Sequence, residues 1–463
     1  MEINEKIDSM KDELISATQK VLKIKSVQDD PKPGMPFGEG VSNALDAALE
    51  ISKKLGFKTV NVDGYVGYAE YGQGEDYVGI LGHLDVVPEG NGWNYPPYGA
   101  EIHDGKLYAR GSMDDKGPIM ASLFGLKAIM DLKLPLTKKV RVIFGTNEET
   151  GSTEIAYYLK KEKPPVSGFT PDAEYPIIYA EKGITIFNIV KELKAKPNGP
   201  MSIKYIKGGL RPNMVPDYTE AGILTDDKPA FIKLVQEYAK KTGFDIKAVD
   251  KDKMVILKSV GIGAHGSLPQ LGKNAIMQLF DFLGSLQLGK CDIAEFVEFL
   301  NKNVGFDVYG GKFGVGLEDK ESGKLSFNIG VIDMNEDKVT MAFNLRYPVT
   351  FKLDDMMKPF NERIKGTGIT IENLEHQAPL FFPEDHPLIK TLQKVYTEQT
   401  GNEATLLAIG GGTYAKEMDN IVAFGPIFPG EIDLDHQSNE YIEVESLVKN
   451  AKIYAHAIYE LAK

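Results

Sequence analysis

The chain has 463 residues, of which 42% are hydrophobic and 26% are charged, as in an ordinary soluble globular protein. This length is too great for a single core, so we expect two or more domains. The 66 acidic residues outnumber the 53 lysines and arginines and give a formal net charge of −13. Nucleic-acid binding needs a basic surface, and the sequence has no basic stripe, so we expect no nucleic-acid partner.

A single cysteine, Cys291, excludes an intramolecular disulfide and favours a reducing environment such as the cytoplasm. The first 22 residues are typical of a charged amphipathic helix and not of a signal peptide. No apolar run approaches the roughly 18 residues that a membrane helix requires. We therefore expect a soluble, cytoplasmic protein that does not enter a membrane.

Hydrophobic periodicity in the first 180 residues or so predicts helices that alternate with short strands. Helices are predicted over residues 5–22, 41–55, 117–132 and 153–160, and strands over 59–62, 66–71, 77–81, 106–109 and 139–144. The alternation returns near the C-terminus, with helices over 387–399 and 444–461 and a strand over 421–424. This pattern is typical of an α/β fold with a mixed, largely parallel sheet flanked by helices.

The residues between these two segments follow a different pattern. Strands are predicted over residues 187–190, 201–207, 223–225, 254–260, 324–332 and 339–347, and helices over 229–241, 274–286 and 292–303. The last two strands are expected to be antiparallel and joined through residues 335–337. We therefore predict an inserted α+β domain, residues 187–382, which splits an α/β domain formed by residues 1–186 and 383–463.

Several acidic and histidine side chains lie where predicted strands end. His83 and Asp85 follow the strand over 77–81, and their i, i+2 spacing places them on one face. Glu148 and Glu149 follow the strand over 139–144. Each pair also has an ordinary interpretation. The first is compatible with a strand-end histidine and a capping aspartate, and the second with a solvated loop.

Three further residues have the same two interpretations. Asp114 precedes a predicted helix, where aspartate commonly serves as an N-cap. Asp172 lies in the sequence Pro-Asp-Ala-Glu, which is also typical of a turn, and His436 lies in a polar loop before the last helix. Together with His83, Glu148 and Glu149 they offer two imidazoles, three carboxylate ligands and one spare carboxylate. That is the inventory of a two-metal hydrolase.

Two glycine-rich segments are candidates for contact with a ligand. The segment 261–267 places His265 either in a plain turn or where the backbone can approach a ligand closely. Gly411, Gly412 and Thr413 lie in a second segment, which is either a flexible turn or a backbone platform for a substrate. No P-loop lysine follows these glycines, so we reject nucleotide binding.

These residues lie in motifs that together resemble the M20 metallopeptidase family, and within it the PepV-type bacterial dipeptidases. The resemblance extends in order over essentially the whole chain. The motifs are GHLDVVP, ARGSMDDKGP, GTNEETGS, PDAEYP, GAHGSLPQLGKNA, NLRYP, AIGGGTYAKEMDNIVAFGP and DHQSNE. The resemblance implies a metal-dependent hydrolase that cleaves dipeptides, including carnosine-like dipeptides of the β-alanyl and Xaa-His type.

The resemblance also implies ligands for two divalent metal ions. His83 and Asp172 would hold one ion, Glu149 and His436 would hold the other, and Asp114 would bridge the two. Zinc is the first expectation, and manganese or cobalt suits the same ligands. In this family the peptide bond after the bridging aspartate is cis, so we expect a cis bond after Asp114.

Residues around the two ions take further roles by the same resemblance. Glu148 would be the general base for a water bridging the metals, and Asp85 would orient the neighbouring imidazole ligand. The inserted domain resembles the family's lid, in which His265 would support the tetrahedral intermediate. Asn213 and Arg346 would bind the C-terminal carboxylate of the substrate.

Two positions depart from the family's pattern. Asn213 lies in the sequence Arg-Pro-Asn-Met-Val-Pro, which differs in detail from what the family leads us to expect. Asp435 precedes His436 at a position where a small residue is expected. The second difference would change the surroundings of the metal ligand without removing it.

The length of the insert bears on the assembly of the protein. A lid this long resembles the branch in which additional lid structure replaces a partner subunit, so we predict a monomer. A stable dimer in sedimentation would contradict that prediction.

Two alternative functions remain compatible with the same residues. An N-acyl amino acid deacylase of the same family would share the metal ligands and Glu148 and would differ only in its specificity pocket. A metal-bearing binding protein with an inactive site is the second alternative, and the intact Glu148 and full ligand set speak against it.

Overall fold

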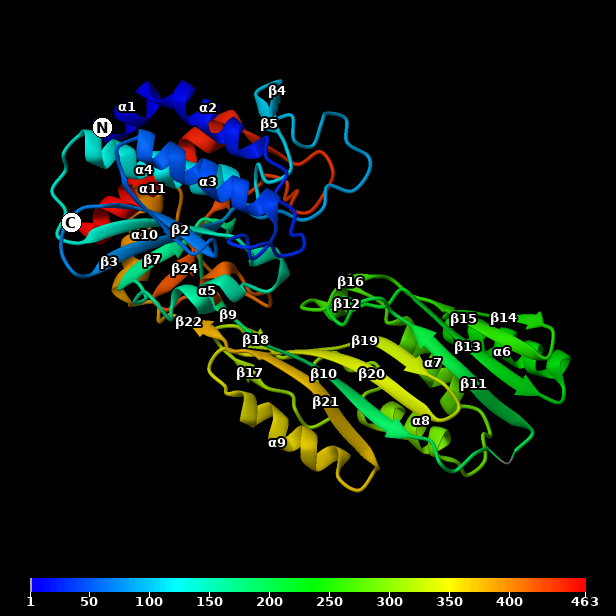
Figure 1. Cartoon of the computed structure of the whole chain (residues 1–463). Helices are drawn as coiled ribbons and strands as arrows, with labels where there is room; N and C mark the ends of the chain where they lie inside the picture. The colour runs from blue at the N-terminus through cyan, green and yellow to red at the C-terminus, as the bar shows by residue number, and fades with distance from the viewer. Residues whose placement is uncertain (1, 198) are drawn as a thin grey trace. The chain divides into compact units, whose positions relative to one another are not determined.

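The computed structural model describes residues 2–197 and 199–463, which divide into two compact units (Figure 1). Unit 1 comprises Met1–Tyr179, Phe382–Leu407 and Gly412–Lys463, and unit 2 comprises Ala180–Phe381 and Ala408–Gly411. The chain thus enters unit 2 before the predicted boundary at 186/187 and leaves it close to the predicted boundary at 382/383.

The short segment Ala408–Gly411 belongs to unit 2, which the sequence did not predict. Its backbone is held there by two hydrogen bonds. The backbone N–H of Lys182 donates to the carbonyl of Ile409 at 3.1 Å, and Arg346 Nη1 donates to the carbonyl of Gly410 at 2.6 Å.

Unit 1 is built on a sheet whose central strands are parallel, as predicted. In spatial order these strands are β6 (Lys139–Gly145), β3 (Tyr77–His83), β7 (Ser167–Thr170) and β24 (Ile421–Ala423). The antiparallel strands beside them are β2 (Val66–Tyr71), β1 (Lys58–Val62) and β9 (Ile177–Glu181). The whole of β3 is buried, as is typical of a parallel strand covered on both faces.

Helices cover both faces of this sheet. Figure 1 shows α3 (Glu39–Lys54) and α4 (Lys116–Asp131) on one face and α5 (Thr153–Tyr158) on the other. The last helix, α11 (Val444–Ala462), packs closely on α4, because a β-carbon at Gly125 would lie 2.9 Å from the backbone nitrogen of Ala455. This packing fixes α4, whose first turn follows Asp114.

The predicted N-terminal helix is two helices, α1 (Glu2–Ser9) and α2 (Lys11–Leu22), with a break at Met10. Each helix buries an apolar face of its own, so the change of direction keeps both faces covered. The remaining elements that lie wholly or partly in unit 1 are β4 (Glu101–His103), β5 (Lys106–Tyr108), η1 (Glu148–Thr150), β8 (Ala173–Glu174), α10 (Pro387–Thr400), β23 (Leu406–Ile409), η3 (Tyr414–Glu417), β25 (Pro426–Ile427) and β26 (Tyr441–Glu443).

Unit 2 contains an antiparallel sheet of eight strands. Their order is β14 (Asp245–Lys251), β15 (Met254–Val260), β13 (Tyr218–Thr225), β11 (Met201–Gly208), β19 (Ser326–Met334), β20 (Lys338–Tyr347), β10 (Gly183–Glu192) and β21 (Ile369–Gln377). The predicted antiparallel pairing of the two strands around residues 335–337 is confirmed, with Met334 opposite Val339. The two edge strands were not predicted, because most of their residues are exposed and polar.

The helices of unit 2 pack on this sheet around one hydrophobic core (Figure 1). They are α6 (Lys228–Thr242), α7 (Ala275–Gly284), α8 (Asp292–Asn303) and α9 (Leu353–Ile364). The ring of Phe360 on α9 lies 5.0 Å from that of Phe187 on β10, which ties this unpredicted helix to the sheet. Pro359 lies inside α9, a position where proline is unfavourable in a helix.

The shorter elements of unit 2 are β12 (Met214–Val215), β16 (Ala264–His265), η2 (Pro269–Leu271), β17 (Glu318–Asp319), β18 (Gly323–Lys324) and β22 (Leu380–Phe381). Cys291 is buried in the core of unit 2. Among the residues that the structure describes, no helix has both the length and the apolar content needed to cross a bilayer.

Candidate metal centre

The carboxyl ends of three adjacent parallel strands bring together acidic and histidine residues of unit 1. His83 is the last residue of β3, and Glu148 and Glu149 form the short turn η1 just after β6. Asp172 follows β7, which pairs with β3 along the edge opposite to β6. Parallel strands end at the same edge of a sheet, so these residues converge there although the chain separates them widely.

Asp114 lies at the centre of this group and contacts a histidine with each of its oxygens. Its Oδ1 lies 2.9 Å from Nε2 of His83, and its Oδ2 lies 3.1 Å from Nε2 of His436. His436 Nε2 also lies 3.1 Å from Glu149 Oε2, and His83 Nε2 lies 3.7 Å from Asp172 Oδ1. One carboxylate therefore separates two histidine–carboxylate pairs.

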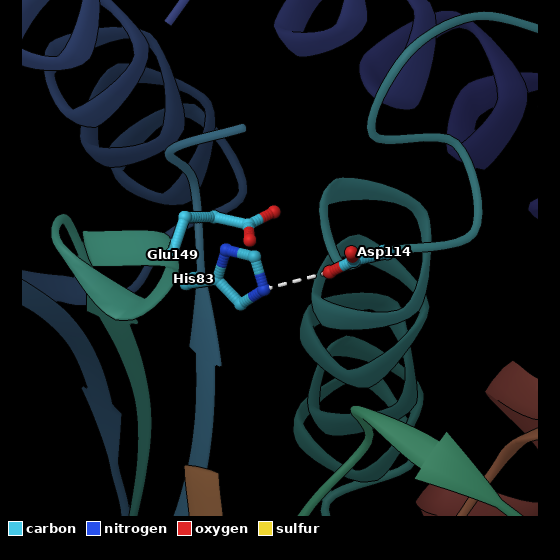
Figure 2. A group of neighbouring side chains, drawn as sticks. All are labelled: His83, Asp114 and Glu149. Carbon is cyan, nitrogen blue, oxygen red and sulfur yellow. Dashed lines mark hydrogen bonds and ion pairs between the residues drawn. The ribbon is translucent and has the colours of Figure 1, made fainter. Parts of the chain in front are cut away.

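The side chains of His83, Asp114 and Glu149 point toward one another, as Figure 2 shows. One potential ligand atom of each lies within 4.8 Å of those of the other two, a spacing that can hold a metal ion. His83, Asp115 and Asp172 form a second such group. Asp115 was not predicted as part of the site. Its carboxylate accepts a hydrogen bond from the backbone of His83 at 3.1 Å. The peptide bond between Asp114 and Asp115 is cis, as expected.

Asp85 accepts hydrogen bonds from His83, Glu148 and Glu149. Its backbone carbonyl accepts a hydrogen bond from His83 Nδ1 at 3.0 Å, closer than its carboxylate at 3.4 Å. The carboxylate instead accepts the backbone N–H groups of Glu148 at 3.2 Å and Glu149 at 3.1 Å. Because a carbonyl can only accept, Nδ1 of His83 carries a proton, so Nε2 is the ring nitrogen that can bind a metal ion when the imidazole is neutral.

Burial and neighbouring charges shift the pKa values of this group. Burial raises the pKa of Glu148 well above its usual value, and repulsion from Asp172, Asp114 and Glu149 adds to the effect. Burial also raises the pKa of Asp172. Burial opposes a charged imidazole at His83, yet the carboxylates of Asp172 and Asp114 outweigh it and raise the pKa of His83 well above its usual value.

The histidine on the other side of Asp114 behaves in the same way. Hydrogen bonds to Asp114 and Glu149 raise the pKa of His436 to about 11. For Asp114 burial acts in the opposite direction, but the hydrogen bonds from His436 and His83 hold its pKa well below the usual value. Protons on the two imidazoles thus stabilise carboxylate charge that divalent cations would stabilise more strongly.

Two buried oxygens of the group support the same interpretation. Within residues 2–197 and 199–463, no protein group donates a hydrogen bond to Glu149 Oε1 or Asp115 Oδ1. A buried carboxylate oxygen without a donor is costly, and coordination to a cation would satisfy it. Imidazole nitrogen and carboxylate oxygen are the ligands that zinc and related divalent ions take in hydrolases, so the residues fit the implied metal ions.

A buried pair behind His83 was not predicted from the sequence. The ring of Tyr414 meets the His83 ring edge-on with centroids 5.9 Å apart, and its hydroxyl donates to Glu154. Burial raises the pKa of Glu154 to about 7. The sequence analysis considered only the glycines and the threonine that precede Tyr414. The sequence contains no signal that pairs this tyrosine with a glutamate 260 residues away.

The candidate substrate residues of unit 2 form a group of their own. His265 is exposed, and its Nδ1 lies 2.6 Å from Ser267 Oγ. Burial of part of the ring and the nearby charge of Arg346 lower the pKa of His265, which favours its neutral form. Arg346 is 5% exposed, and its Nε donates to Asn344 Oδ1 at 3.0 Å. Burial lowers the pKa of Arg346 to about 10, which leaves it charged at neutral pH.

Asn213 is tied to the same group through its backbone. Its carbonyl accepts a hydrogen bond from Gly266 at 2.7 Å, and the next residue, Met214, pairs with His265 in a short two-stranded sheet. The glycine segment is divided between the units. Gly411 belongs to unit 2, whereas Gly412 and Thr413 belong to unit 1. Thr413 accepts a hydrogen bond from Ala415 and so caps η3.

Comparisons with known proteins relate the chain to a peptidase family. Residues 79–460 match the sequence model of peptidase family M20/M25/M40. The Bacillus subtilis (strain 168) protein named "Putative dipeptidase YtjP" is 40% identical over 457 residues, which cover 98% of this chain and 98% of that protein. The Staphylococcus epidermidis (strain ATCC 12228 / FDA PCI 1200) protein named "Putative dipeptidase" is 36% identical over 463 residues, which cover 99% of this chain and 98% of that one.

Solved structures with low sequence identity share the fold. Human carnosine dipeptidase 1 has a TM-score of 0.60 at 17% identity, covering 99% of this chain and 98% of that chain. Aminoacylhistidine dipeptidase from Vibrio alginolyticus has a TM-score of 0.60 at 12% identity, covering 97% and 96%. At these identities the likeness concerns the fold alone.

Proposed function

The chain belongs to peptidase family M20/M25/M40, and from that premise we propose that it is a two-metal dipeptidase with Glu148 as its general base. One observation carries the proposal above the others. The two oxygens of Asp114 contact Nε2 of His83 and Nε2 of His436 separately, so that this carboxylate can serve two metal ions at once.

In this proposal each ion has its own pair of ligands. His83 and Asp172 hold one ion, Glu149 and His436 hold the other, and Asp114 is shared. Divalent ions at these ligands supply Lewis acidity and make water at the site more acidic. Zinc is the proposed metal, with manganese or cobalt as substitutes that the same ligands accept.

The protein's own residues then move the protons. With positive charge among the carboxylates, Glu148 is ionised and can accept a proton from the attacking water. The same carboxyl group returns that proton to the leaving amine. Asp85 fixes the backbone of Glu148 and Glu149, because its two carboxylate oxygens accept hydrogen bonds from their adjacent backbone N–H groups.

Unit 2 supplies the groups that recognise the substrate. In its neutral form His265 has a proton on one ring nitrogen, and when Ser267 donates to Nδ1 that proton is on Nε2. Nε2 can then donate to the oxyanion of the tetrahedral intermediate. Arg346 uses two of its five N–H groups within unit 2 in the hydrogen bonds described, which leaves donors for a carboxylate.

The dipeptide is the proposed substrate class for two reasons. The relatives that match this chain over its whole length at 40% and 36% identity bear dipeptidase names. A charged, buried guanidinium is suited to a free C-terminal carboxylate, which lies one residue from the scissile bond only in a dipeptide or at the C-terminal end of a longer peptide. Dipeptides of the β-alanyl and Xaa-His type are included in the proposal.

A substrate comparison on the full-length protein tests this function. The protein is stripped with a chelator, reconstituted with zinc, manganese or cobalt, and assayed with Ala-Ala, β-Ala-His and an N-acetyl amino acid. We expect dipeptide hydrolysis that is lost on chelation and restored by metal. Faster cleavage of the N-acetyl amino acid would indicate a deacylase, and no hydrolysis by metal-replete protein would indicate a binding protein.

The role of Arg346 can be tested by measuring kcat and KM separately. We expect Arg346→Lys to raise the KM for dipeptides by roughly 10-fold or more, because an ammonium group cannot form the bidentate contact with a carboxylate. Arg363→Lys is the matched control, since Arg363 lies in the same unit and bonds only to Phe313 and Asn303 among its described partners. An unchanged KM for Arg346→Lys would remove Arg346 from substrate binding.

A further inference from the structure

Glu440 lies four residues after His436 and gathers hydrogen bonds from the loop that carries Asp114. Its Oε1 accepts the backbone N–H groups of Met113 at 2.8 Å and Asp114 at 3.3 Å. Its Oε2 accepts the backbone N–H of Gly111 at 3.1 Å and Arg110 Nη1 at 2.6 Å. One carboxylate therefore holds four donors from a five-residue segment.

The pair formed by Glu440 and Arg110 is completely enclosed. Glu440 is 0% exposed and Arg110 is 2% exposed. Burying a carboxylate among other carboxylates is unfavourable unless it is paired and fully hydrogen-bonded, and Arg110 supplies the opposite charge. The contact is therefore a specific structural feature of the site and not a surface ion pair.

The loop of His436 meets the site through the His436 side chain, which contacts Asp114 and Glu149, and through Glu440. The His436 side chain is 57% exposed and its backbone is left-handed, with φ of 62°. Asn439 ties the loop outward, because its side chain donates to the carbonyl of Gly92 at 3.0 Å and accepts from the backbone of Asn94 at 2.6 Å. Glu440 connects the same loop to the backbone of Asp114.

The other histidine is fixed independently of Glu440. His83 is the end residue of a buried central strand, and its ring and backbone are held by Asp85 and Asp115. Loss of Glu440 would thus leave the His83 side in place and free the backbone of Asp114 to shift relative to His436. We propose that Glu440, paired with Arg110, is a positioning residue that fixes the bridging carboxylate relative to His436 and thereby sets the affinity for the metal ion on the His436 side.

This inference rests on the proposed two-metal function, and its test separates the two. Zinc binding is measured on chelator-stripped protein at buffered free zinc concentrations, with metal content determined after dialysis. The parent protein is expected to bind two ions, and a parent that binds fewer would refute the proposed function itself. Folding of every variant is checked by circular dichroism and thermal unfolding.

Glu440→Gln replaces an acceptor oxygen by an NH₂ group that faces backbone N–H donors. We expect it to lower the affinity for one ion about 10- to 100-fold, as orienting residues around metal ligands do, and to leave the other affinity unchanged. Glu443→Gln is the matched control, because Glu443 is exposed on the adjoining strand β26 and should keep both affinities. Two unchanged affinities in folded Glu440→Gln protein would overturn the inference.

The His436→Ala variant serves to test whether the ion bound more weakly in Glu440→Gln is the one on the His436 side. His436→Ala should retain one ion at His83, and adding Glu440→Gln to it should not change the remaining affinity, since effects through a shared element are not additive. A further loss in the double variant would contradict a role on the His436 side. If Glu440→Gln does not fold, Arg110→Lys carries the test with a smaller expected loss of the same ion, and unchanged affinities there would overturn the inference.

Discussion

Glu148→Gln is expected to lower kcat for dipeptide hydrolysis by about 10²- to 10⁴-fold while the protein keeps two metal ions. The amide has nearly the shape of the carboxylate but cannot accept a proton from water. The metal content should remain because Glu148 is outside the proposed ligand set, and its backbone N–H would still donate to Asp85. Steady-state kinetics and metal analysis on the same preparation measure both quantities.

Two comparisons make this result specific to Glu148. Glu148→Ala should show the same loss with the same metal content, since both variants lack the base. Glu75→Gln changes an exposed glutamate in the same unit and should have parental activity. Retained activity in Glu148→Gln would assign the proton transfer to another group, whereas loss of an ion would make Glu148 a ligand.

Asp114→Asn is expected to weaken both metal ions together, which no other single substitution at the site should do. The amide keeps one oxygen and turns the other ligand position into an NH₂ donor, and it removes the negative charge shared by the two ions. Residues that merely orient ligands contribute about 10- to 100-fold to affinity, so the loss of the shared ligand should exceed about 100-fold for at least one ion. Hydrolysis should be lost in parallel.

The control for this substitution is Asp104→Asn. Asp104 lies in an exposed turn with φ of 49°, a conformation that asparagine adopts as readily as aspartate, so this variant should keep both ions and full activity. Two tightly bound ions in folded Asp114→Asn protein would show that Asp114 is not shared, and the proposed arrangement would then be wrong.

The sequence predicts the part of the site that the sheet itself creates. His83 ends one strand, Glu148 and Asp172 follow two others, and the ends of parallel strands meet at one edge. Their proximity therefore depends on predicting the strands, which strong hydrophobic runs make straightforward. The α/β and α+β character of the two segments could be predicted for the same reason.

The remaining features depend on contacts between distant segments, for which a single sequence has no periodic signal. His436 reaches Asp114 through a loop whose position depends on Glu440. Asp115 is not among the predicted metal ligands, although its carboxylate accepts a hydrogen bond from the backbone of His83. The assignment of residues 408–411 to unit 2 follows from hydrogen bonds to Lys182 and Arg346, which lie far away in the chain.

The edge strands and α9 were missed for a different physical reason. Strand β21 exposes most of its residues, and the alternation of apolar and polar residues that predicts a strand stops after its first four. Helix α9 contains Pro359, which is unfavourable in an isolated helix, but the burial of Phe360 against Phe187 provides tertiary contacts for it. Tertiary packing thus outweighs local propensity at these elements.

The most direct test of a shared aspartate is a crystal structure of the zinc-loaded protein with anomalous data collected on both sides of the zinc absorption edge. We predict two anomalous peaks about 3.5–4 Å apart, one beside His83 and Asp172 and the other beside His436 and Glu149, with the carboxylate of Asp114 between them. A single peak, or a pair of peaks of which only one lies within bonding distance of Asp114, would contradict the account.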